Sequence, residues 1–437
     1  MAKVFHEVRD PIHTFVRLDT QERMVLDSMP IQRLRDIHQL SMTYLVYPGA
    51  THSRFEHSLG VMDLASRVFD VITHPNALKD EIIQFLPETQ NEDERNYWRR
   101  VIRMAALCHD IGHLPFSHTA EEELLPDGWD HERLTVKFIR SQVMRSLWKE
   151  MTPPLRTEDI VKLAVGQKHL PDTSFTDWET ILSEIIVDDA FGVDRIDYLL
   201  RDSHHLGITY GKFDHHRLID TLRILPKVAP PGKRPSTSNE PTIGIEIGGI
   251  HCAESLLLAR YFMYIQVYFH PVRRIYDRHL IEFLQEWLEE GKFAVDTDTL
   301  LFHTDAGVLK GMLDASKDVS HPAHKAACRI TRREHFRRVY SRNPEDLAIN
   351  SAPGESIETA LAKEFGEDNV RRDKYSEKEF VFDFPVLDHD ERVLSSKAVS
   401  EPLKNIPHVS VDNVFITPEL KDAAISWIEK NRKRVLK

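Results

Sequence analysis

Two histidines and two aspartates in this sequence have the side chains needed to hold a divalent metal ion. They are His57, the adjacent pair His109 and Asp110, and Asp194. Adjacent residues point in different directions on a regular helix, so this pair meets one ion only where a helix ends or where other helices close around it. Gly112 follows the pair and favours such an end. Two imidazole nitrogens and two carboxylate oxygens suit a borderline or hard divalent ion, namely Mn, Fe, Zn, Ni or Mg.

A second group of polar residues follows directly and could move protons beside such an ion. It contains His113, His118, Glu121 and His131. On a helix, His118 and Glu121 would share one face. A carboxylate that binds a histidine fixes its tautomer and raises its basicity, so this pair can deprotonate water or protonate a leaving group. An isolated His–Asp dipeptide at a helix end is more often structural, and only the surrounding histidines favour a site here.

The composition favours histidine and carboxylate over cysteine as metal ligands. The 437 residues include 24 histidines but only 3 cysteines, too few and too far apart for a disulfide framework or a zinc knuckle. A reducing, cytoplasmic compartment fits this cysteine usage. The net charge of −12 does not favour a general nucleic-acid coat, so nucleic-acid binding stays possible but is not indicated. The sequence has no apolar signal region at its start and no run of about 18 apolar residues, so we expect neither a signal peptide nor a membrane span.

Helices must position most of these residues, and the sequence predicts a mainly α-helical fold. Apolar residues recur at threes and fours over long stretches, which is the helical period. Helices are expected over residues 21–40, 55–71, 91–110, 157–170, 178–207, 251–291 and 295–340. Weak alternation predicts a short strand at residues 15–18, ahead of the first helix.

A proline- and serine-rich segment at residues 226–241 interrupts the helices. Strand-like residues 222–225 and 243–247 flank it, which favours a β-hairpin with a long tip, inserted around residues 218–248, over a domain linker. Two parts are therefore expected, a core over residues 1–340 and a small α+β region over residues 341–437. In the second part, alternation predicts a strand at 379–384 and amphipathic spacing predicts a helix at 421–435. No motif in that region suggests a role for it.

Three sequence blocks resemble the HD-domain deoxynucleoside triphosphate triphosphohydrolases. They are SRFEHSLGV at 53–61, LCHDIGHLPFSH at 107–118 and DRIDYLLRDSHHLGI at 194–208. Their order and spacing are similar to those of the vertebrate sterile-alpha-motif/HD enzyme and its bacterial relatives, over roughly residues 1–340. The resemblance implies a helical HD core and a metal-dependent hydrolysis of deoxynucleoside triphosphates (dNTPs) to deoxynucleoside and inorganic triphosphate.

The resemblance also implies roles for individual residues. His57, His109, Asp110 and Asp194 match the metal ligands; His113, His118 and His131 match histidines around the α-phosphate, with Glu121 orienting His118. The substrate contacts are matched by Gln39 and Leu40 at the deoxyribose, by Arg54, Arg195, Tyr198 and Asp202 at the triphosphate and sugar, and by Arg260 and Tyr268. A leucine at position 40 would leave no room for a 2′-hydroxyl. Two positions depart from the vertebrate enzyme, which has lysine in place of Arg195 and histidine in place of Tyr264.

Some members of that family bind an activating nucleotide between subunits, and five residues resemble this site. They are Asp27, Gln32, Arg35, Arg333 and Arg337, for which a solvated charged surface is the alternative. A site shared between chains implies a homodimer or homotetramer. Two other functions stay open, namely a different HD phosphohydrolase (a nucleotidase, or a cyclic-nucleotide or alarmone phosphodiesterase) and a non-hydrolytic protein that binds nucleotide or nucleic acid.

Overall fold

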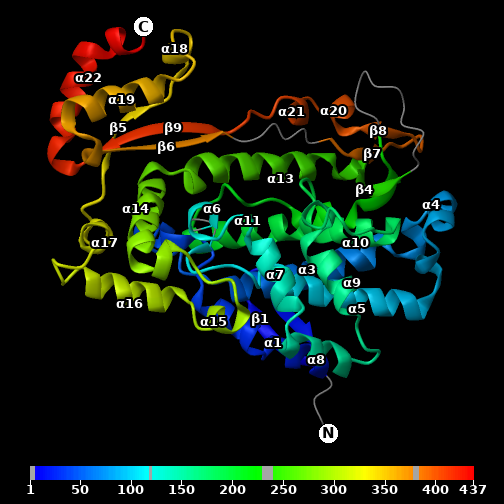
Figure 1. The fold of residues 1–437 in the computed structure, drawn as a ribbon. Coiled ribbons are helices and arrows are strands. Elements are labelled where there is room, and N and C mark those ends of the chain that lie inside the picture. The colour runs from blue at the N-terminus through cyan, green and yellow to red at the C-terminus, as the bar shows by residue number, and fades with distance from the viewer. Residues whose placement is uncertain (1–4, 118–120, 229–239, 377–382) are drawn as a thin grey trace.

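Helices dominate the fold, and small sheets lie at its periphery (Figure 1). The structure is a computed structural model that describes residues 5–117, 121–228, 240–376 and 383–437. The predicted mainly α fold with a small hairpin and a C-terminal α+β region is confirmed. None of the described helices is both long enough and apolar enough to cross a membrane.

Five helices form the centre of the molecule and carry the blocks that hold the candidate ligands. They are α3 (Arg54–Ile72), α5 (Glu92–Cys108), α9 (Thr157–Val165), α10 (Asp177–Val187) and α11 (Val193–Leu206). Capping boxes begin two of them, since Ser53 with Glu56 caps α3 and Thr176 with Glu179 caps α10. Most residues of α3 are buried, which fits its position between α5, α10 and α11.

Shorter helices surround this centre and lead into the C-terminal part. Before α11 these are α1 (Thr20–Leu26), α2 (Met29–Gln32), α4 (Asp80–Phe85), α6 (Glu121–Leu124), α7 (His131–Ile139) and α8 (Gln142–Glu150). After it come α12 (His215–Asp220), α13 (Ile250–Met263), α14 (Pro271–Trp287), α15 (Thr297–Leu300), α16 (Asp305–Ala315), α17 (His324–Thr331), α18 (Pro344–Leu347), α19 (Pro353–Phe365), α20 (Ser396–Val399), α21 (Glu401–Lys404) and α22 (Lys421–Val435).

Four of the long predicted helices are broken. The segment 295–340 divides into α15, α16 and α17, and its last residues belong to the strand Arg337–Ser341. The other three break at an identifiable residue. The segment 21–40 forms α1, α2 and 3₁₀ turns, because Pro30 cannot continue a preceding helix. The segment 178–207 divides at Gly192, where a Cβ atom would lie 2.6 Å from the Asp188 carbonyl oxygen. The segment 251–291 passes through a π turn (Tyr264–Tyr268) before Pro271 begins α14. Helix α22 lies where the amphipathic pattern predicts it.

The strands form three sheets among the described residues. Strands β1 (His6–Asp10) and β2 (Thr14–Leu18) make an N-terminal hairpin. Strands β3 (Leu222–Pro226) and β4 (Pro241–Glu246) are antiparallel, which confirms the predicted hairpin, while most of its tip lies outside the described residues. Strand β7 (Pro385–Leu387) joins β4 in parallel and β8 (Val393–Ser395) follows. The third sheet has the order β5 (Arg337–Ser341), β9 (Ser410–Ile416), β6 (Val370–Ser376). The predicted strand at 379–384 falls mostly outside the described residues.

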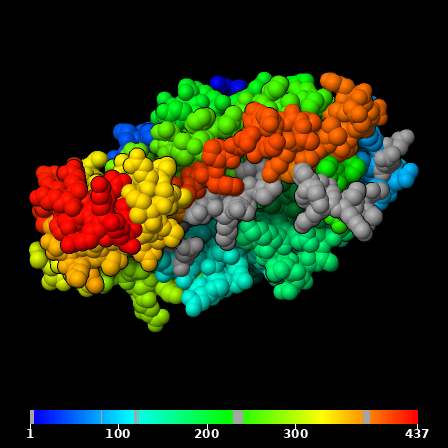
Figure 2. Space-filling view, turned by 90° about the horizontal axis from the view of Figure 1, so that it is seen from above, coloured from blue at the N-terminus to red at the C-terminus, as the bar shows by residue number. Residues whose placement is uncertain are grey.

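The C-terminal region packs partly on the helical core and partly on its own small core. Phe384, Val386 and Leu403 belong to the main apolar cluster, and β7 extends the hairpin sheet. Helices α19 and α22 with the β5–β9–β6 sheet enclose a separate cluster that includes Ile357 and Val414. From above, residues after β6 (orange) cross the surface of the helical core (Figure 2). The domain boundary near residue 340 stays a prediction.

Candidate metal centre and adjoining cavity

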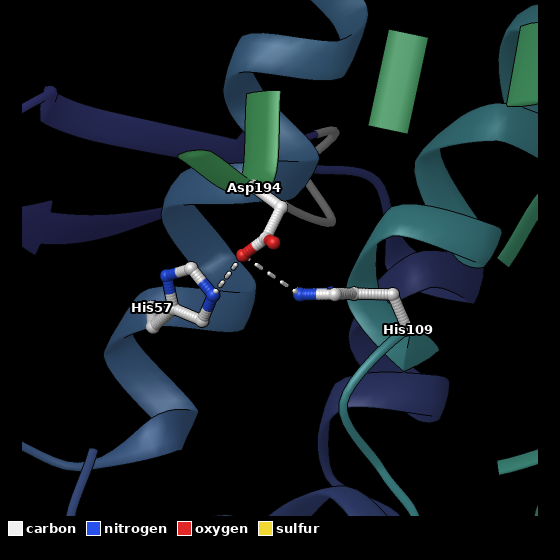
Figure 3. A group of neighbouring side chains, drawn as sticks. All are labelled: His57, His109 and Asp194. Carbon is white, nitrogen blue, oxygen red and sulfur yellow. Dashed lines mark hydrogen bonds and ion pairs between the residues drawn. The ribbon is translucent and has the colours of Figure 1, made fainter. Parts of the chain in front are cut away.

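The candidate metal ligands converge at three helix ends, although they lie far apart in the sequence. His57 stands in the first turn of α3, His109 caps the C-terminus of α5, and Asp194 stands in the first turn of α11. Figure 3 shows one carboxylate oxygen of Asp194 facing both rings, 3.0 Å from His57 Nε2 and 3.5 Å from His109 Nε2. Asp110 completes the group, with Oδ1 at 3.4 Å from His109 Nε2 and Oδ2 at 3.6 Å from His57 Nε2.

The hydrogen bonds behind His109 show that this group fits a cation. Its Nδ1 donates to the Ala106 carbonyl oxygen at 2.8 Å, which leaves Nε2 of the neutral ring with a lone pair. That buried Nε2 has no hydrogen-bond partner among the described residues and faces the carboxylates of Asp110 and Asp194. A lone pair opposite carboxylate oxygens is unfavourable unless a positive charge lies between them. Three of these residues, His57, His109 and Asp194, present ligand atoms within 4.8 Å of one another.

The electrostatics of the group lead to the same conclusion. Burial opposes a charge on His57, but its hydrogen bonds with Asp194 and Asp197 prevail and raise its pKa to about 10. Burial also opposes ionisation of Asp194, yet His109 and His57 hold the pKa of that carboxyl well below its ordinary value. Arg54 donates to Asp110 and keeps the pKa of Asp110 low in the same way, against burial. The carboxylates are therefore ionised at neutral pH and attract a cation.

A stacked pair of histidines lies beside the candidate ligands. The rings of His113 and His131 are 4.0 Å apart and nearly parallel, and Glu121 touches Nδ1 of both, at 3.3 Å and 2.9 Å. Burial lowers the pKa of His131, but the hydrogen bond with Glu121 outweighs it and raises that pKa to about 9. Burial, Arg54 and His131 together lower the pKa of His113 to about 3. One ring is thus charged and the other neutral at pH 7.

His118 lies outside the described residues, so the predicted contact between His118 and Glu121 is not tested. The contacts of Glu121 that the structure describes are those with the rings of His131 and His113. The sequence spacing of Glu121 and His131 gives no sign of this pair, because α6 and α7 are separated by a turn.

A cavity of about 840 Å³ opens beside this centre. Its wall contains ten of the residues singled out in the sequence, namely Gln39, Leu40, Arg54, Asp110, Glu121, His131, Asp194, Tyr198, Asp202 and Tyr268. Two hydrogen bonds fix the Asp202 carboxylate, one at 2.7 Å from the Tyr268 hydroxyl and one at 2.7 Å with His52 Nε2. The rings of Tyr198 and Tyr268 meet edge to face, 6.2 Å apart. Asp110 and Asp194 of the candidate metal ligands therefore share one cavity wall with the candidate sugar contacts, while His57 and His109 are not among the described residues that line it.

Arg195 and Arg260 are not among the described residues that line the cavity. Arg195 donates to the Asp188 carbonyl oxygen at 3.0 Å and lies 3.3 Å from Asp189. The Arg260 guanidinium is buried, 5.1 Å from the centre of the Tyr264 ring. Burial raises the pKa of Tyr198, and these two arginines partly oppose that rise, so both lie near its hydroxyl. Contact between either arginine and a ligand stays a prediction.

Several cavity residues were not singled out in the sequence. Helix α14 contributes Arg273, Arg274, Asp277, Arg278 and Ile281, and strand β6 contributes Arg372, Asp373, Lys374 and Tyr375. The spacing of Arg274 and Arg278 on one helix face is a signal that could have marked α14. The residues of β6 show no comparable spacing in the sequence, and only the fold brings this strand to the cavity.

The five residues of the predicted activator site lie in two groups. In the first, Gln32 donates to the Leu26 carbonyl oxygen at 2.8 Å, Arg35 donates to Gln32 at 2.8 Å, and Asp27 pairs with Arg23. In the second, Arg333 donates to the Leu45 carbonyl oxygen at 3.1 Å and Arg337 contacts His335. Within the part of the chain that the structure describes, no hydrogen bond or ion pair joins the two groups, and the site stays a prediction.

Comparison with known proteins agrees with this arrangement. Residues 54–202 match the HD domain, and residues 213–410 match the HD associated region, which runs across residue 340. A crystal structure of a hypothetical protein from Aquifex aeolicus is similar with a TM-score of 0.77 and 30% identity, covering 97% of this chain and 99% of that one.

Relatives of two kinds, an uncharacterized protein and the SAMHD1 enzymes, are similar to this chain at modest identity. An uncharacterized protein of Methanocaldococcus jannaschii is 36% identical over 283 residues, which is 64% of this chain and 50% of that protein. The deoxynucleoside triphosphate triphosphohydrolase SAMHD1 of Gallus gallus is 33% identical over 245 residues, 51% of this chain and 37% of that protein. The human SAMHD1 is 32% identical over 237 residues, 50% of this chain and 36% of that protein. This chain thus spans between about a third and a half of the length of these relatives.

The HD domain match begins at Arg54 and ends at Asp202, so it contains His57, the His109–Asp110 pair and Asp194. With the HD associated region following it, this chain belongs to the family of HD-domain proteins that carry an HD associated region.

Proposed function

We propose that this protein is a metal-dependent hydrolase that converts deoxynucleoside triphosphates to deoxynucleoside and inorganic triphosphate. One observation carries the proposal: two of the candidate metal ligands, Asp110 and Asp194, stand in the wall of the same 840 Å³ cavity as Gln39, Leu40, Tyr198, Asp202 and Tyr268, and the His57 and His109 rings lie directly behind Asp194. A cavity of this size accommodates a nucleotide. The similarity to SAMHD1 supports the choice of dNTP among the substrates of HD phosphohydrolases.

His57, His109, Asp110 and Asp194 would hold the ion, which is Mn, Fe, Zn, Ni or Mg by the chemistry of these donors. When bound there, the ion supplies Lewis acidity at the α-phosphate. The Arg54 guanidinium adds a second positive charge beside the ion, because it donates a hydrogen bond to the candidate ligand Asp110. Positive charge offsets the repulsion between the triphosphate and an attacking water oxygen.

His131 supplies the proton for the leaving group. The attacking water oxygen bonds to the α-phosphorus and releases one proton to solvent. The bond from that phosphorus to the 5′-oxygen breaks, and the 5′-oxygen takes a proton from His131 to become the deoxynucleoside hydroxyl. Solvent then returns a proton to His131. His131 carries that proton at neutral pH, because Glu121 raises its pKa to about 9 against burial. His113 is neutral and donates one hydrogen bond to a phosphate oxygen. His118 shares the proton transfer, as the resemblance implies.

The opposite end of the cavity holds the sugar and the remaining phosphates. Leu40 and Gln39 contact the deoxyribose, and the Asp202–Tyr268 pair presents oxygen atoms to its 3′-hydroxyl. Tyr198 contacts the triphosphate, with Arg195 and Arg260 behind it. An activating nucleotide binds at the site of Arg35 and Arg333 in a homodimer or homotetramer.

Product identification tests this function. Purified protein is incubated with each dNTP and each ribonucleoside triphosphate, singly and in mixtures, with Mn²⁺ or Mg²⁺. We expect deoxynucleoside and intact triphosphate in a one-to-one ratio from dNTPs, and little from ribonucleotides. Hydrolysis only in mixtures would reveal the activating nucleotide. Orthophosphate or pyrophosphate as the product would identify a different HD phosphohydrolase, and binding of dNTP and metal without any product would identify a nucleotide-binding protein.

A further inference from the structure

Asp197 is a buried carboxylate that lies one turn after Asp194 on α11 and points away from the cavity, toward the back of His57. Its two oxygens accept four hydrogen bonds. Oδ2 accepts from His57 Nδ1 at 2.8 Å and from Arg201 Nε at 2.8 Å. Oδ1 accepts from His13 Nε2 at 2.6 Å and from Arg201 Nη2 at 2.9 Å. Four donors occupy all the lone-pair positions of a carboxylate, so its orientation is fixed.

The bond from His57 Nδ1 determines which nitrogen of that ring can bind an ion. A carboxylate only accepts, so Nδ1 must carry a proton, and Nε2 is the nitrogen that gives up its proton and offers a lone pair when an ion binds. Nε2 is the atom that faces Asp194 and Asp110, at 3.0 Å and 3.6 Å. The ring therefore presents a ligand atom on one side because Asp197 holds a proton on the other.

The buried residues around Asp197 hold its carboxylate in this orientation. His57, His13, Asp197 and Arg201 are all buried, and Arg201 also binds Asp10 at 2.9 Å. Asp10 ends β1, and His13 lies in the turn before β2, so the N-terminal hairpin contributes two members of the group. On the opposite side Gly60 lies against Asp197, where a Cβ atom would come within 1.9 Å of its Oδ1. Gly60 thus leaves the space that the carboxylate fills.

We propose that Asp197, held by Arg201 and by His13 of the N-terminal hairpin, is a positioning residue that fixes the tautomer and orientation of His57 for metal binding. This inference rests on the proposed metal centre. Carboxylates behind metal-bound histidines contribute about 10- to 100-fold to metal affinity.

The test compares metal affinity with fold stability in the full chain. Asp197→Asn keeps the size of the side chain but turns one acceptor into an NH₂ donor, which opposes either His57 Nδ1–H or a donor of Arg201. We expect the Kd for Mn²⁺, measured by titration calorimetry on metal-free protein, to rise at least about tenfold. Glu179→Gln is the control, since it removes a buried charge paired with Lys162 at 2.8 Å and does not touch His57. Glu179→Gln should lower the melting temperature of the metal-free protein, while its Kd for Mn²⁺ should change by less than about twofold.

The outcomes separate this inference from the proposed function. If the wild-type protein binds none of Mn²⁺, Zn²⁺ or Co²⁺, the metal centre and the function that uses it are wrong. If the wild type binds Mn²⁺ and Asp197→Asn binds it equally well, only the role of Asp197 is overturned. If Asp197→Asn does not fold, His13→Phe replaces it, because this change keeps a ring but removes a single donor from Asp197 and should weaken Mn²⁺ binding by a smaller factor; unchanged binding would again overturn the inference.

Discussion

Arg274 and Asp373, which are 99 residues apart, form a two-point ion pair that joins the helical core to the C-terminal region. Arg274 Nε donates to Oδ2 at 2.9 Å and Nη2 donates to Oδ1 at 2.5 Å, and the Asp373 side chain is buried. The pair fixes β6 against α14, and both elements line the cavity. The C-terminal region therefore contributes to the wall of the candidate active site, which no motif in that region predicts.

Breaking this pair should loosen the cavity wall. Asp373→Asn leaves Arg274 without its partner charge and should lower the free energy of unfolding by about 2 to 3 kcal/mol, because one partner of a largely buried pair is lost. The KM for the proposed substrate should rise more than kcat falls. Urea unfolding and steady-state kinetics measure both effects. Glu391→Gln is the control, since its pair with Lys79 is exposed and should contribute less than about 1 kcal/mol; an equal loss in both variants would contradict the argument.

Metal binding should stabilise the fold through Asp194. Mn²⁺ at about 100 times its Kd should add about 2.7 kcal/mol to the free energy of unfolding of the wild type. Asp194→Asn removes the negative charge of the carboxylate that faces both His57 and His109, so we expect neither this gain nor hydrolysis. Asp189→Asn, on the exposed loop before α11, should keep the full metal-dependent gain. Thermal and urea unfolding with and without Mn²⁺ measure the difference, and a retained gain in Asp194→Asn would exclude this ligand.

The rate should depend on the charge of His131. The proposed donor is active when protonated, so activity should be retained below its pKa of about 9 and lost as the pH rises through that value. Glu121→Gln removes the carboxylate that raises this pKa and should move the alkaline limit of kcat to lower pH. Glu123→Gln is the matched control, because Glu123 lines the same cavity but pairs with Arg278. An alkaline limit that is the same in Glu121→Gln and wild type would rule out this pair as the proton donor.

The free energy of unfolding should fall between about pH 4.5 and 7 because of Glu184 on α10. Burial, and then repulsion by Asp188, raise the pKa of this carboxyl from 4.5 to about 7. The folded protein therefore holds a proton that the unfolded chain releases, so the contribution is complete below about pH 4.5 and is lost as the pH rises through about 7. The shift corresponds to about 3 kcal/mol.

Glu184→Gln keeps an acceptor for the Thr242 hydroxyl and the Ile243 amide, which bind Glu184 at 2.9 Å and 3.1 Å. Urea unfolding at a series of pH values should give a flatter curve for this variant than for the wild type. The exposed Glu158, paired with Arg140, provides the comparison, since Glu158→Gln should leave the shape of the curve unchanged. A wild-type curve that Glu184→Gln does not flatten would show that this carboxyl is ionised in the folded protein.

Some elements could be predicted from the sequence because local chemistry decides them. The apolar period predicts α3 and α22, and the flanking strand-like residues predict the β3–β4 pair across a proline-rich tip. The apolar period did not predict the helix breaks at Pro30, Gly192 and Pro271. A period read over a long segment stays the same on both sides of a single residue that ends a helix. The parallel pairing of β7 with β4 could not be predicted, since two short strands about 140 residues apart carry no local signal of each other.

For the site, the sequence by itself determined which side chains are available and that the His109–Asp110 pair stands where a helix ends. Residue type sets the donor atoms, and helix termini are local features. Only the tertiary structure decided the partners. It places Asp197 behind His57 and Glu121 against His131 and His113. It also leaves Arg195 and Arg260 out of the cavity wall and brings β6 into that wall. These partners come from different elements, and their pairing depends on the packing of helices whose relative positions no local pattern encodes.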